Sequence, residues 1–221
     1  MGMPIPDLAN LPGSSRPGGG GGGAFEYTAI DNSFSMQFDG SSVVNTDLSV
    51  DATNGMTLSL WLKCGTQSGL VFLCSRGGTG GTLSQFNFRI AGGALLSYFN
   101  GSVNFNSLLT GLDTNTWNHV VITVNYSTGD VIGYKNTVQG PNTLTYGSAR
   151  TTAQFRCIGA ASSTGAYGMV GKIDEVALWT TVLSQETIQA IYDTTANNPG
   201  KVADLSETPE GAPTAWYRMG D

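Results

Sequence analysis

Most of the chain alternates apolar and polar residues with the two-residue period of a half-buried β-strand. Residues 33–38 show the pattern through Phe34, Met36 and Phe38, and a turn at 127–129 predicts a hairpin. The predicted strands are 33–38, 57–63, 70–74, 86–90, 94–99, 119–126, 130–135, 155–159 and 172–179. Short strands between glycine-rich turns predict an all-β fold, an antiparallel jelly-roll β-sandwich, rather than a parallel α/β sheet.

One short helix is predicted near the C-terminal end of this pattern. Ser184 is a good N-cap, and Glu186 lies in the first turn, where a negative charge is favourable. Ile188, Ile191 and Tyr192 fall on one face at helical spacing, so we expect that face to pack on the sandwich.

Two terminal segments differ from the sandwich. Residues 1–23 contain four prolines and a run of six glycines, and they have too little apolar surface to offset the conformational entropy of folding. We expect an extended docking arm over 1–23, the sandwich over 24–193, and a C-terminal strap over 194–221. The strap is polar and rich in proline, which predicts an irregular path anchored by Trp216 and Tyr217.

Composition and charge exclude several classes. The net charge of −6 and the scattered Lys and Arg residues argue against nucleic-acid binding, which needs a basic face. The N-terminal sequence lacks the basic and apolar regions of a secretory signal, and no apolar run is long enough to insert in a membrane. Cys64, Cys74 and Cys157 read as small core residues, with a Cys64–Cys74 disulfide as the geometric alternative.

Four segments, in this order, carry a resemblance to a known family. They are FDG at 38–40, LSLW at 58–61, WNHVV at 117–121, and GKIDEV at 171–176 leading into the predicted helix. This set resembles the laminin G-like group of the concanavalin A-like lectin and glucanase superfamily over residues 33–193. The resemblance implies a two-sheet jelly roll that binds glycans, proteins or calcium.

The two ends of the chain carry a second resemblance. FSMQFDG at 34–40 and WYRMGD at 216–221 are similar to segments of virion-associated proteins of marine tailed phages. This implies a virion structural protein, made in the host cytoplasm, that serves as a head decoration, fibre or tail component. Residues 1–23 would dock on other virion proteins, and the sandwich would self-associate and contact host surface glycans. The alternative is a free, calcium-dependent carbohydrate-binding lectin.

Catalytic chemistry is not expected. Asp174 and Glu175 are adjacent, so on a regular strand their side chains point to opposite faces and cannot act on one substrate. His119 is the sole histidine and has no neighbouring triad motif, which favours a structural role. We therefore expect a protein that is not an enzyme.

Calcium is the cofactor that the sequence best accommodates. Asp174 shares a predicted strand face with Val176 and Leu178, and a buried carboxylate needs a cation or several N–H donors. Superfamily members hold an ion where the first and last strands meet, and Asp39 lies near that seam by analogy. Either Asp39 and Asp174 bind Ca²⁺ together, or Asp174 accepts backbone hydrogen bonds in a turn.

A sugar site needs an exposed aromatic ring beside polar side chains. Trp61, Trp117 and Trp179 are expected in the core. The remaining candidates on loop edges are Tyr98, Phe99, Asn100, Asn104, Tyr126, Tyr146 and Tyr167.

Overall fold

A computed structural model describes residues 3–4, 25–51, 53–65, 71–74, 86–99, 106–145, 152–160, 164–165 and 167–219. It confirms the predicted antiparallel β-sandwich, since every strand pair within its two main sheets is antiparallel. Of the predicted docking arm, only Met3 and Pro4 belong to the described residues; the rest of 1–23 lies outside them.

The larger sheet has eight strands, and its order brings distant parts of the chain together. Strand β16 pairs with β14 beside the main path. The order along the main path is β1 (Met3–Pro4), β3 (Phe34–Asp39), β14 (Val170–Trp179), β5 (Met56–Cys64), β10 (Asn118–Val124), β11 (Asp130–Lys135) and β12 (Val138–Thr145), with β16 at Ala215–Tyr217.

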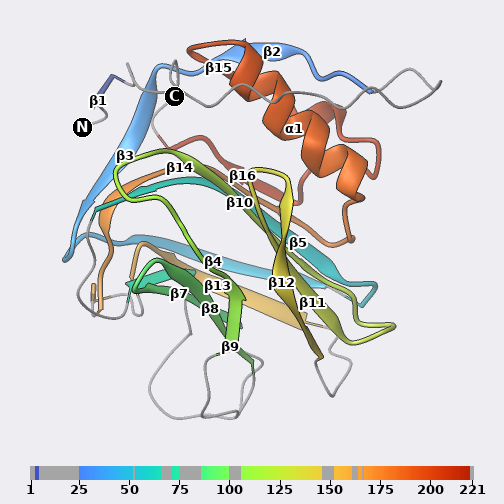
Figure 1. Ribbon diagram of the computed structural model, residues 1–221, viewed down its shortest axis with the longest axis horizontal. Helices are drawn as coiled ribbons and strands as arrows, with labels where there is room; N and C mark the ends of the chain where they lie inside the picture. Colours follow the sequence, from blue (N-terminus) through green and yellow to red (C-terminus); the bar gives the residue numbers. More distant parts are fainter. Residues whose placement is uncertain are drawn as a thin grey trace.

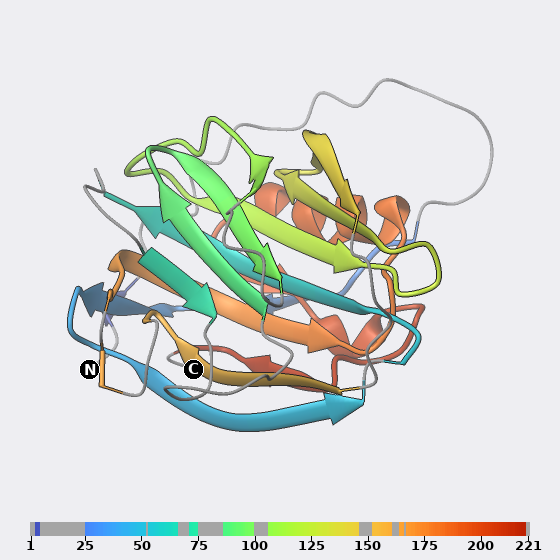
Figure 2. The same cartoon turned by 90° about the horizontal axis from the view of Figure 1, so that it is seen from below.

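The smaller sheet has six strands and packs against one face of the larger sheet, as Figures 1 and 2 show. Its order is β4 (Val44–Asp51), β13 (Thr152–Ile158), β6 (Val71–Cys74), β7 (Phe86–Ala91), β8 (Ala94–Phe99) and β9 (Asn106–Leu109). Strands β4 and β9 of this sheet, and β12 of the larger sheet, were not among the predicted strands.

The main core lies between the two sheets, and the period of two decides which side chains enter it. In β5, Leu58, Leu60 and Leu62 face this core and are at most 2% exposed. The intervening Ser59 and Trp61 therefore project from the other face of the sheet. Burial of each leucine contributes about 1.5–3 kcal/mol relative to an exposed side chain.

Helix α1 (Gln185–Asn197) covers that second face of the larger sheet (Figure 1). The predicted cap is confirmed, because Ser184 Oγ accepts a hydrogen bond of 3.2 Å from the backbone N–H of Thr187. Ile188, Ile191 and Tyr192 are buried against the sheet, as predicted. The sheet is thus covered on both faces, and the layers run from helix to larger sheet to smaller sheet.

The C-terminal segment is more regular than the predicted irregular strap. Strand β15 (Lys201–Ala203) pairs with β2 (Ala29–Asp31), a short 3₁₀ turn η2 follows at Leu205–Glu207, and β16 joins the larger sheet. Backbone pairing with earlier strands supplies the order that the polar sequence alone did not indicate.

Two smaller expectations concern the thiols and the membrane. Cys64 and Cys157 are buried thiols rather than halves of a disulfide, which agrees with a role as core residues. Among the described residues, no helix combines the length and the apolar character that a membrane crossing requires.

Candidate functional site

A β-bulge in β14 places two carboxylates together on the helix side of the larger sheet. Asp174 pairs with Trp61 and Ala177 pairs with Ser59, so β14 has one residue more than β5 in this stretch. Glu175 lies within this bulge and has a φ of 50°. Asn32 Nδ2 then donates to both carboxylates, at 3.1 Å to Asp174 and 2.9 Å to Glu175.

The bulge corrects two predictions. Asp174 and Glu175 do not point to opposite faces, because the extra residue interrupts the alternation between them. Nor does Asp174 share a face with Val176 and Leu178, which lie in the core between the sheets. Burial of Asp174 was predicted correctly: its exposed fraction is 1%.

Both carboxylates are bound by donors from the chain itself. Glu175, 3% exposed, accepts from Trp216 Nε1 at 2.5 Å and from Arg218 Nε at 3.4 Å, besides Asn32. Asp174 Oδ1 accepts the backbone N–H of Glu175 at 2.9 Å. We call Asn32, Asp174, Glu175, Trp216 and Arg218 the carboxylate clamp. Both of its acids are buried.

His119 lies next to the clamp on the same face of the sheet. Its Nε2 and Ser59 Oγ are 2.8 Å apart, and its ring stacks on Trp61 with 4.9 Å between centroids. Burial lowers the pKa of His119 to about 3, so the ring is neutral at physiological pH. A buried, neutral ring under the helix agrees with the predicted structural role.

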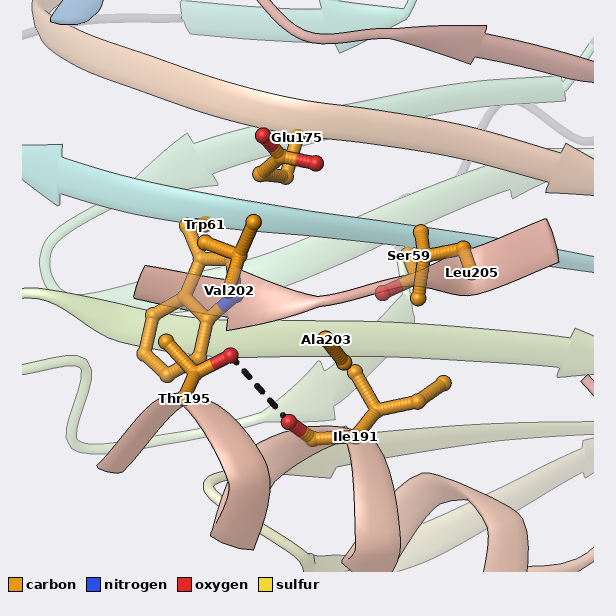
Figure 3. A pocket seen from close by; sticks show the side chains of 8 residues that line it. All are labelled: Ser59, Trp61, Glu175, Ile191, Thr195, Val202, Ala203 and Leu205. Carbon is orange, nitrogen blue, oxygen red and sulfur yellow. Dashed lines mark hydrogen bonds between the residues drawn. The ribbon is translucent and has the colours of Figure 1, made fainter. Parts of the chain in front are cut away.

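A small cavity lies between the helix and this face (Figure 3). Ser59, Trp61 and Glu175 line it from the sheet, and Ile191 and Thr195 line it from α1. It encloses about 10 Å³, roughly the space of one water molecule. A sugar ring does not fit there.

The structure places the two predicted calcium ligands apart. Asp39 pairs with Val170, four residues before Asp174 on β14, a separation of about 13 Å at the usual rise per residue. Asp39 lies at the end of β3, where its Oδ1 accepts bonds from Ser41 and Ser42. In the described ranges, no three His, Cys, Asp or Glu side chains are grouped to hold a metal. The calcium site stays a prediction, and these two residues alone do not form it.

The aromatic candidates for a sugar site separate by exposure. Trp61, Trp117 and Trp179 are buried, as predicted, and Tyr126 is only 7% exposed. Tyr167 is 64% exposed, on the connection between β13 and β14. The side chains of Tyr98 and Phe99, and residues Asn100, Asn104 and Tyr146, lie outside the described part of the chain.

The comparisons with known proteins agree with this geometry. The family model described as "Concanavalin A-like lectin/glucanases superfamily", of laminin G type, matches residues 38–189, more than half of the chain. A search among curated proteins gives no match.

Solved structures match the fold at low sequence identity. A putative carbohydrate binding protein from Bacteroides ovatus has a TM-score of 0.60 and 15% identity, and the match covers 89% of this chain and 53% of that one. The Ruminococcus gnavus IT-sialidase CBM40 bound to α2,3 sialyllactose has a TM-score of 0.57 and 13% identity, with coverage of 77% and 100%. A heptameric SAP-like pentraxin from Limulus polyphemus has a TM-score of 0.54 and 15% identity, with coverage of 71% and 80%.

Sialidases also occur among the matches, over 27–28% of their chains. At these identities the structures show the fold alone. Together with the ordered strand pairing and the capped helix, the family match settles the classification: the chain belongs to the concanavalin A-like lectin/glucanases superfamily.

Proposed function

We propose that the protein is a carbohydrate-binding module that recognises a glycan without cleaving it. The observation that carries the proposal is the lectin-like sandwich, a fold shared with a putative carbohydrate binding protein and with a CBM40 bound to sialyllactose. The burial of Asp174 and Glu175 supports the non-catalytic part, since a glycosidase needs two carboxyl groups open to the substrate.

Binding of the full-length chain to a panel of immobilised oligosaccharides tests the proposal. We expect saturable binding to a subset of glycans, and no release of sugar from the bound oligosaccharides. Running the panel with calcium and with a chelator tests the predicted calcium dependence in the same experiment. Absence of binding under both conditions would contradict the proposal, and release of sugar would contradict its non-catalytic part.

A virion structural component is the second candidate, supported by the resemblance at 34–40 and 216–221. The arm's strand β1 pairs with β3 at the edge of the larger sheet, through Met3 with Ser35 and Pro4 with Phe34. A sheet edge is a surface on which chains pair with one another, which suits docking and self-association. In this role residues 1–23 would attach the module to the particle, and the sandwich would face outward.

Co-sedimentation with large particles from the native source tests the structural role. Full-length protein is expected in the pellet, and a chain lacking residues 1–23 in the supernatant. If both stay in the supernatant, the structural role is wrong, whereas glycan binding by the truncated chain would leave the carbohydrate-binding proposal intact.

A further inference from the structure

We propose that the glycan site lies on a rim formed by Tyr167 and the turn of residues 39–42, and that it takes a neutral pyranose sugar. This inference rests on the proposed function and names the site for it. The rim lies at the end of the sandwich where β3 leads into β4 and where the chain from β13 enters β14 (Figure 2).

Tyr167 is held in a conformation that a bulky residue rarely adopts. Its φ of 54° is in the left-handed region, while the residue is 64% exposed. Such strain persists where the surrounding structure fixes it, often at a ligand site. Burial does not account for the conformation, because most of the residue is exposed.

The backbone around Tyr167 is fixed by close contacts with the neighbouring turn. A Cβ on Gly165 would overlap the carbonyl oxygen of Ser41, and a Cβ on Gly168 would overlap that of Gly40. Met169 is fully buried, and its carbonyl accepts the N–H of Gly40 at 2.8 Å. The described residues on both sides of the tyrosine, Gly165 and Gly168, therefore lie directly against the 39–42 turn, and a backbone held in this way lowers the entropy lost on binding.

Asp39 supplies a polar partner on the same rim. Its Oδ1 accepts the N–H and hydroxyl groups of Ser41 and Ser42, all at 2.9 Å. These bonds hold the pKa of Asp39 well below its usual range, so the carboxylate is ionised. No described donor bonds to its other oxygen, and the side chain is exposed. That oxygen is an acceptor for sugar hydroxyl groups.

The pairing of these groups selects the class of ligand. An aromatic ring packs against the apolar C–H face of a pyranose, and a carboxylate accepts hydrogen bonds from its hydroxyl groups. An acidic sugar would be repelled by Asp39 and by the net charge of −6. The rim thus fits a neutral hexose better than a sialylated or uronic residue.

The test uses the full chain and two rim variants on immobilised neutral oligosaccharides, with sialylated ones beside them. Tyr167→Asn removes the ring but keeps a residue that tolerates positive φ. Asp39→Asn keeps an Oδ1 acceptor for the turn and removes the charge. Val138→Ser is the control, since Val138 is 68% exposed on β12, at the far edge of the larger sheet.

We expect Tyr167→Asn to weaken binding to neutral glycans at least about tenfold, Asp39→Asn about threefold or more, and Val138→Ser less than twofold. All variants should keep the circular dichroism spectrum of the wild type. If the wild type binds neutral glycans and both rim variants bind equally well, the site lies elsewhere and the carbohydrate-binding proposal stands. Wild-type binding confined to sialylated glycans would overturn the ligand class, and no binding at all would overturn both proposals.

Discussion

At the scale of single residues, Glu175 connects three segments that are far apart in the chain. Asn32 donates to its carboxylate from before β3, and Trp216 and Arg218 donate from the C-terminal segment. Its backbone is in the left-handed region, which is unfavourable for a residue with a Cβ. The hydrogen bonds stabilise the side chain at this position, because a buried carboxylate is stable only when its oxygens are satisfied.

Glu175→Gln is expected to lower the free energy of unfolding by about 1–3 kcal/mol. The amide nitrogen of glutamine replaces one of the two oxygens, so it cannot accept either the bond from Trp216 at Oε2 or the bonds from Asn32 and Arg218 at Oε1. Urea denaturation followed by tryptophan fluorescence measures the change. Glu26→Gln is the matched control, because Glu26 is exposed, and we expect less than about 0.5 kcal/mol there. Equal effects at both positions would show that the clamp adds no stability.

His119 gives the protein a pH-dependent stability below neutral pH. Burial lowers its pKa from the ordinary 6.5 to about 3, so the unfolded chain takes up a proton between these values and the folded chain does not. The stability from the neutral ring is fully present above pH 6.5 and is lost as the pH falls toward 3.

We expect the wild type to lose about 2 kcal/mol of unfolding free energy between pH 7.5 and 5.0 from this residue. Because His119 is the sole histidine, His119→Gln should remove most of that slope, although it lowers stability at pH 7.5. Urea titrations of both proteins at the two pH values measure the difference. An unchanged slope in the variant would mean that other groups set the pH dependence.

At the scale of elements, the helix depends on its first turn. Ser184 Oγ accepts the N–H of Thr187, and Glu210 accepts the N–H of Ser184 and the hydroxyl of Thr187. Two of the first N–H groups of the helix region are thereby satisfied by side chains. The helix in turn covers His119 and the clamp, so its start affects the whole outer face.

Ser184→Ala should destabilise the protein by about 1 kcal/mol through loss of this cap. Gln185→Ala, one residue further on at an exposed position, is the control and should change stability by less than about 0.5 kcal/mol. Thermal melts and urea curves measure both. A cap contribution is refuted if the two variants are equally stable.

A strand could be predicted from the sequence where its alternation of apolar and polar residues matches the side chains that are buried. Strand β5 was evident because Leu58, Leu60 and Leu62 alternate with residues on the other face. Strand β12 has an exposed, polar sequence with Gly140 and Pro141, so it carries no apolar pattern; its order comes from pairing with β11. Such an edge strand is determined by its neighbour rather than by its own residues.

The site was predictable only in part, for a different reason. The bulge at Glu175 depends on a register shift of one residue against β5, which alternation of sequence does not reveal. Its partners Asn32, Trp216 and Arg218 were likewise not identified, because tertiary pairing brings them together. The exposed Tyr167 was among the named aromatic candidates, but its exposure depends on how the loop packs on Gly40 and Ser41.

At the scale of the whole molecule, the C-terminal segment completes the larger sheet. Strand β16 pairs with β14 beside the bulge, and Arg218 Nη2 also donates to the backbone carbonyl of Asp31 at 2.6 Å. The segment thus links the first strands of the sandwich to the last one. Its removal would leave Glu175 without the donors Trp216 and Arg218.

A chain ended after Pro213 tests this role, and its cost should depend on the charge at position 175. In the wild-type background, loss of residues 214–221 leaves a carboxylate without two of its donors, and we expect a loss of about 3–5 kcal/mol. In a Glu175→Gln background the same truncation leaves a neutral amide, so it should cost at least about 1 kcal/mol less. Urea denaturation of the four proteins measures the coupling.

The two backgrounds also keep the test decisive if the truncated wild-type sequence fails to fold. A cooperative unfolding transition that returns on adding Glu175→Gln would show that the unpaired charge, rather than the missing strand, caused the failure. If truncation costs the same in both backgrounds, the segment stabilises the sheet through strand pairing and apolar contact alone. In that case the donors Trp216 and Arg218 would have no specific effect on Glu175, and the clamp would not couple the two ends of the chain.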